Sequence, residues 1–137
     1  MSIVIDQAIR AQLIASAPGT HPVPARLRYE PSDPFAIRVT FPPAASLDGF
    51  EVEWAFGRDL LAEGLRQPAG SGDVYVWPCG PERVVVEFRA VEGMAMVQLD
   101  TADVREFLRR SYGLVPAGDE GTYLDLDADL AALLRDA

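Results

Sequence analysis

Residues 52–78 change their hydrophobic period twice, and this limits the folds that the chain can adopt. Val52, Trp54 and Phe56 alternate with polar or small residues, which predicts a strand with one apolar face. Apolar and small residues then recur at helical spacing, and a second strand follows a Gly-Ser-Gly turn. Both tryptophans of the chain lie in this segment. The pattern predicts a short helix that connects two strands.

The predicted helix runs from Arg58 to Arg66. Its stripe of apolar and small residues consists of Gly57, Leu60, Leu61, Gly64 and Leu65. A glycine inside a helix weakens it by about 1 kcal/mol, so we expect the glycines to allow a close approach between the helix and a sheet. The stripe has two interpretations, since it can face either this chain's own core or another protein surface.

The remaining sequence predicts an α+β domain spanning residues 1–137. Strands are predicted over residues 3–14, 25–30, 35–41, 50–56, 73–77, 83–91 and 94–99. Helices are predicted over residues 58–66, 101–113 and 126–134. A bulge is expected near Gln7, and the proline-rich segment 16–24 is expected to be a loop. About seven antiparallel strands would then form a twisted sheet or open barrel with three helices.

The charge balance argues against nucleic acid as a partner. The chain has 21 acidic residues, 12 basic residues and a formal net charge of −9, whereas nucleic-acid binders need cations that neutralise phosphates. No apolar run reaches the length of a membrane span, and Asp6 and Arg10 interrupt any signal-peptide core. We therefore expect a cytoplasmic protein whose partners are neutral or basic.

The sequence offers weak candidates for chemistry, and each has a simpler structural interpretation. Residues 125–129 place carboxylates at alternate positions as a calcium loop does, but Leu130 replaces the required glycine, so helix capping is favoured. His21, the single histidine, lies among prolines without a nominated nucleophile. Gly70-Ser71-Gly72 precedes a strand, which favours a turn. We expect no catalytic, cofactor or metal site.

A second interpretation concerns the polar faces of two neighbouring predicted strands. Arg26, Arg28 and Arg38 project there near aromatic residues, as in proteins that bind single-stranded nucleic acid. Asp33, Glu51 and Glu53 could instead neutralise these arginines in a salt-bridged sheet face. The net charge favours the salt-bridged face.

The chain resembles the SsgA-like proteins of sporulating actinobacteria over nearly its whole length. The resemblance rests on residues 22–25, 27–41, 52–78 and 123–134, and the most specific run is Arg58-Asp59-Leu60-Leu61-Ala62-Glu63-Gly64. It implies a role in sporulation-specific cell division at the septum, where such proteins help to place the tubulin-like protein FtsZ together with SsgA-like relatives. It also implies a fold similar to the Whirly single-strand binders, assembled as a homotrimer.

The leading hypothesis is therefore a non-enzymatic scaffold that binds division proteins. The residues that we expect to contact a partner or another subunit are Trp54, Arg58, Leu60, Leu61, Leu65 and Trp77. The alternative is a single-stranded nucleic-acid-binding module of Whirly-like fold.

Overall fold

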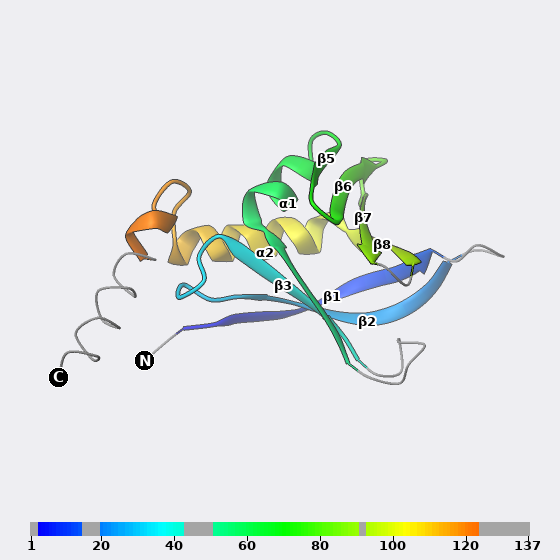
Figure 1. The fold of residues 1–137 in the computed structure, drawn as a ribbon, viewed down its shortest axis with the longest axis horizontal. Helices are drawn as coiled ribbons and strands as arrows, with labels where there is room; N and C mark the ends of the chain where they lie inside the picture. Colours follow the sequence, from blue (N-terminus) through cyan, green and yellow to red (C-terminus); the bar gives the residue numbers. More distant parts are fainter. Residues whose placement is uncertain (1–2, 15–19, 43–50, 91–92, 124–137) are drawn as a thin grey trace.

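The computed structural model describes residues 3–14, 20–42, 51–90 and 93–123, which form one curled antiparallel sheet with helices packed against it (Figure 1). Its strands are β1 (Ile5–Ile14), β2 (Thr20–Tyr29), β3 (Ala36–Phe41), β4 (Val52–Gly57), β5 (Ala69–Ser71), β6 (Val74–Cys79), β7 (Arg83–Ala90) and β8 (Gly93–Asp100). Its helices are α1 (Arg58–Gly64) and α2 (Thr101–Leu114), and a further helical turn occupies residues 120–123. The predicted α+β class and antiparallel open barrel are confirmed.

The strand order is β4-β3-β2-β1-β8-β7-β6-β5, and every neighbouring pair is antiparallel. The sheet curls into a half-barrel, which brings Phe88 of β7 into contact with Phe41, Trp54 and Phe56 from the opposite end of the sheet. Helix α1 connects β4 to β5 and packs against β4, β5 and β6. Helix α2 packs on β1 and β8, and Asp100 caps it by accepting a hydrogen bond from the Ala102 amide.

Strand β1 has no bulge, so that prediction is wrong. Its register with β2 is unbroken from Ile5 opposite Tyr29 to Ile14 opposite Thr20. Gln7 lies on the apolar side of the strand, where α2 supplies polar partners for its side chain. Its side-chain nitrogen donates to the Asp103 carbonyl at 3.0 Å, and its oxygen accepts from Arg110 at 3.0 Å. A polar residue in an apolar row therefore marks a helix contact here, not a shift of phase.

Strand β2 begins at Thr20, so the predicted loop is wrong for residues 20–24. Pro22 and Pro24 are paired with β1. Strand β3 pairs only with residues 26–28 of β2, so the prolines lie where β2 has no β3 neighbour. Proline lacks an amide donor and is tolerated at such edges.

The strand missed by the sequence prediction is β5. Ala69, Gly70 and Ser71 pair with β6, and the turn follows at Gly72, which has a φ of 60°. The strand is only three residues long and carries no large side chain, so periodicity gives no signal for it. The predicted helix over residues 126–134 and the acidic segment 125–129 lie outside the described residues.

The expected close approach of α1 to the sheet is confirmed at Gly64. Gly64 is buried, and a Cβ placed on it would overlap the Val76 side chain on β6. Leu61 is fully buried and Leu60 nearly so. The stripe therefore packs against this chain's own sheet.

Replacing Gly64 with alanine should destabilise the protein despite the better helix propensity of alanine. The overlap with Val76 should cost about 1–3 kcal/mol, whereas the propensity gain is at most about 1 kcal/mol. Gly113→Ala is the matched control, because a Cβ on Gly113 in α2 meets nothing within 4 Å. Urea denaturation should lower the midpoint for Gly64→Ala and leave it unchanged or higher for Gly113→Ala. A midpoint that rises for Gly64→Ala would contradict this packing.

Candidate functional site

Arg58, at the start of α1, lies at the centre of a buried polar cluster and is only 1% exposed. One terminal nitrogen, Nη1, donates to the Val115 carbonyl at 2.8 Å and to the Ser111 carbonyl at 3.2 Å. The other, Nη2, donates to Glu120 Oε1 at 3.0 Å. That carboxylate oxygen also accepts from the Gly118 amide at 2.7 Å. The cluster joins α1 to the end of α2 and to the segment that follows it.

Two tyrosine rings enclose the Arg58 guanidinium. Its central carbon lies 4.8 Å from the Tyr29 ring centroid and 4.5 Å from that of Tyr112, which favours cation–π attraction. Burial raises the pKa of Tyr29 to about 12, although the Arg58 charge acts in the opposite direction. Burial also raises the pKa of Tyr112. Both phenols are therefore neutral at physiological pH, and the carboxylate that pairs with Arg58 is Glu120.

This cluster has the features of a structural link. Arg58 and Glu120 are both buried, so neither is open to a substrate. Arg58 Nε is buried without a hydrogen-bond partner among the described residues. The remaining partners are backbone carbonyls, the Ser111 hydroxyl and neutral phenols.

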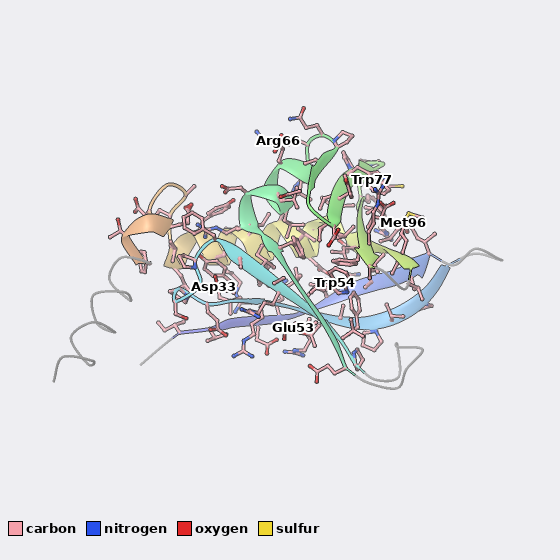
Figure 2. The ribbon with its side chains drawn as sticks, viewed as in Figure 1. Asp33, Glu53, Trp54, Arg66, Trp77 and Met96 are labelled. Carbon is pink, nitrogen blue, oxygen red and sulfur yellow. The ribbon has the colours of Figure 1, made fainter. Side chains whose placement is uncertain are left out.

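The six residues predicted to contact partners do not form one surface. Arg58, Leu60 and Leu61 are buried, whereas Trp54, Leu65 and Trp77 are partly exposed. Trp54 packs inside the half-barrel, with its ring 5.0 Å from that of Phe88. Trp77 lies on the outer face of β6, and Figure 2 shows the two tryptophans well apart.

Sequence reasoning missed a group of residues beside Trp77. Tyr75 on β6 and Glu87 and Arg89 on β7 line a pocket with it. The available signal was Glu87 itself, because this residue interrupts the apolar run of β7 and is nevertheless buried. A carboxylate inside such a run requires a partner or a function.

The arginine-rich sheet face is salt-bridged, as the sequence indicated. Arg26 pairs with Asp6 at 2.6 Å and Arg28 with Glu30 at 3.0 Å. Arg38 pairs with Asp33 at 3.0 Å and with Glu53 at 2.9 Å. The hydrogen bonds from Arg38 to Glu53 and Asp33 raise the pKa of Arg38. Asp33 and Glu53 were predicted partners, whereas Asp6 and Glu30 were not.

These ion pairs predict that the protein does not bind single-stranded DNA. A phosphate would have to displace a carboxylate from each arginine while approaching a chain of net charge −9. Fluorescence anisotropy of a labelled oligonucleotide at about 50 mM salt, where phosphate contacts are strong, should remain unchanged. A salt-sensitive rise that Arg26→Gln abolishes would instead support the nucleic-acid interpretation.

A groove of about 540 Å³ crosses the outer face where β1, β2 and β8 meet. Arg10 and Arg83 line it, but both lie within 4 Å of the Asp100 carboxylate, at 3.8 and 3.6 Å. Arg10 also pairs with Asp103 at 3.5 Å. The positive charges that line the groove are therefore paired with carboxylates of this chain.

Residues 3–14, 20–42, 51–90 and 93–123 contain no cluster of three or more His, Cys, Asp or Glu side chains placed to hold a metal ion. No helix in these ranges is both long and apolar enough to cross a membrane.

The fold defines a class of small α+β proteins in which one curled antiparallel sheet is packed with helices. A solved SsgA-like sporulation-specific cell division protein from Thermobifida fusca has this fold, with a TM-score of 0.85, 39% identity and coverage of 96% of each chain. The family described as "Streptomyces sporulation and cell division protein, SsgA" matches residues 23–120. The chain belongs to this SsgA family, which confirms the resemblance.

Curated relatives support the same assignment across the length of the chain. The sporulation-specific cell division protein SsgB of Frankia casuarinae is 43% identical over 136 residues, which cover 97% of this chain and 92% of that protein. SsgB of Streptomyces coelicolor is 38% identical over 140 residues, and both chains are covered fully. The sequence similarity therefore includes residues outside the family match.

Proposed function

We propose that the protein is a non-enzymatic scaffold of sporulation-specific cell division that recruits FtsZ to septation sites. It would act in the cytoplasm at the septum, together with SsgA-like relatives and as a homotrimer. The observation that carries this proposal is the similarity over 97–100% of the chain to proteins named sporulation-specific cell division protein SsgB.

The side-chain arrangement supports a binding role. The ion pair of the Arg58 cluster, Arg58 with Glu120, is buried, and the arginines of the sheet face are in ion pairs. Of the six residues proposed for partner or subunit contact, Trp54, Leu65 and Trp77 retain exposed surface. Arg58, Leu60 and Leu61 would act indirectly, by fixing α1 against the sheet.

Co-sedimentation with polymerised FtsZ tests the proposal. The wild-type chain should sediment with the polymers, and Trp77→Ala should reduce the bound fraction several-fold, because aromatic anchors dominate protein interfaces. Phe35→Ala is the control, since Phe35 is 49% exposed in the β2–β3 connection. Absence of wild-type co-sedimentation, together with absence of a fluorescent fusion from septa, would overturn recruitment. Light scattering would test the trimer.

A further inference from the structure

A pocket of about 290 Å³ opens on the outer face of β5, β6 and β7. We call it the Glu87 pocket, and its lining residues are Pro68, Ala69, Gly70, Tyr75, Trp77, Glu87 and Arg89. We propose that the Glu87 pocket binds an arginine side chain from a basic segment of a partner protein. The proposal rests on the geometry of the pocket and does not depend on FtsZ recruitment.

Strand alternation places the aromatic wall of the pocket. Val74 and Val76 of β6 point into the core, so Tyr75 and Trp77 project from the opposite face. Tyr75 pairs across the strands with Gly70, and a Cβ on Gly70 would overlap the Tyr75 ring. The absence of a side chain at Gly70 therefore lets the ring lie against β5.

The floor of the pocket contains a carboxylate that is almost removed from solvent. Glu87 is flanked across the strands by Tyr75 on β6 and Met96 on β8, and its side chain is 9% exposed. Burying a carboxylate is costly unless cations or hydrogen bonds compensate for the lost water. Arg89 supplies one compensation, because its Nε donates to Glu87 Oε2 at 2.6 Å. The other carboxylate oxygen, Oε1, takes no part in that hydrogen bond.

Arg89 also shows how a guanidinium fits these walls. Its central carbon lies 4.2 Å from the Tyr75 ring centroid, and its side chain is 53% exposed. The hydrogen bond to Glu87 raises the pKa of Arg89, and the nearby charge of Asp73 acts in the same direction. Arg89 therefore contacts one oxygen of the Glu87 carboxylate and one face of the Tyr75 ring.

The pocket offers an incoming cation the same two kinds of group, a carboxylate and an aromatic ring. Trp77 lines the pocket together with Glu87, and tryptophan is the side chain with the strongest cation–π attraction. Arginine fits better than lysine, because its planar fork can stack on a ring while donating to a carboxylate. The charge of Arg89 is matched by Glu87, and the chain's net charge of −9 attracts a basic segment.

The test is an NMR titration of the isotope-labelled full chain with the capped tripeptide acetyl-Gly-Arg-Gly-amide. Amide shifts should concentrate at Gly70, Tyr75, Trp77 and the Trp77 indole, with a dissociation constant in the millimolar range. The capped Gly-Gln-Gly peptide, which lacks the charge, should cause no such shifts. Glu87→Gln should weaken arginine-peptide binding about tenfold or more, which corresponds to the loss of a charge-assisted hydrogen bond.

Glu106→Gln is the matched control, because Glu106 is also paired with an arginine but lies on α2, away from the pocket. It should leave the affinity unchanged, whereas Trp77→Ala should weaken it as Glu87→Gln does. Equal shifts with the glutamine peptide, or equal losses for Glu87→Gln and Glu106→Gln, would overturn the proposal, as would no shift at the pocket. A chain that binds the peptide but not FtsZ would leave this site standing and overturn only recruitment.

Discussion

Replacing Arg58 with alanine is expected to destabilise the folded protein by about 3–5 kcal/mol, the usual result of removing one partner from a buried ion pair. The substitution leaves the Glu120 carboxylate buried, and among the described residues its remaining hydrogen-bond donor is the Gly118 amide at 2.7 Å. It also removes the hydrogen bonds to the Ser111 and Val115 carbonyls and the cation between two tyrosine rings. Urea denaturation followed by circular dichroism would measure the loss.

The control is Arg38→Ala, which breaks two ion pairs at once but on the surface. Arg38 is 40% exposed, and such pairs contribute about 1 kcal/mol or less. Combining Arg58→Ala with Glu120→Ala should cost less than the sum of the single losses, because no buried charge then remains unpaired. A loss for Arg58→Ala no larger than that for Arg38→Ala would contradict the structural role of the cluster.

The Arg58 cluster also shows which features could be predicted from the sequence and which could not. The helix around it could be predicted from the spacing of Leu60, Leu61 and Gly64, because periodicity is a local property. The burial of Arg58 could not, since Glu120 lies 62 residues away in the chain. An arginine next to an apolar stripe is usually solvated, and only the tertiary fold brings the compensating carboxylate to it.

Some strands of the sheet could likewise be predicted from the sequence, whereas others could not. The alternation of inward-facing and outward-facing residues predicted β3 and β4, because this pattern is visible in consecutive residues of the sequence. It did not predict the first part of β2, because proline composition indicated a loop and only the pairing with β1 keeps Pro22 and Pro24 extended. The Glu87 pocket was missed because its members come from different strands, and their proximity depends on the register between β6 and β7.

Replacing Phe88 with alanine should give the second large loss of stability, about 3–5 kcal/mol. Phe88 is 3% exposed and contacts three aromatic rings from the far end of the sheet. Its ring centroid lies 6.2 Å from that of Phe41, 5.0 Å from Trp54 and 6.1 Å from Phe56. No backbone ladder joins β7 to β3 or β4, so these side chains hold the curled sheet together across its interior.

The same substitution at an exposed phenylalanine separates this role from a general effect of losing an aromatic ring. Phe35→Ala should change stability by no more than about 0.5 kcal/mol, because Phe35 is 49% exposed. Tryptophan fluorescence should also change in Phe88→Ala, since Trp54 loses the ring that packs against it. If Phe88→Ala were as mild as Phe35→Ala, the two ends of the sheet would not depend on this contact. Closure of the half-barrel would then rest on α1, which packs against both β4 and β6.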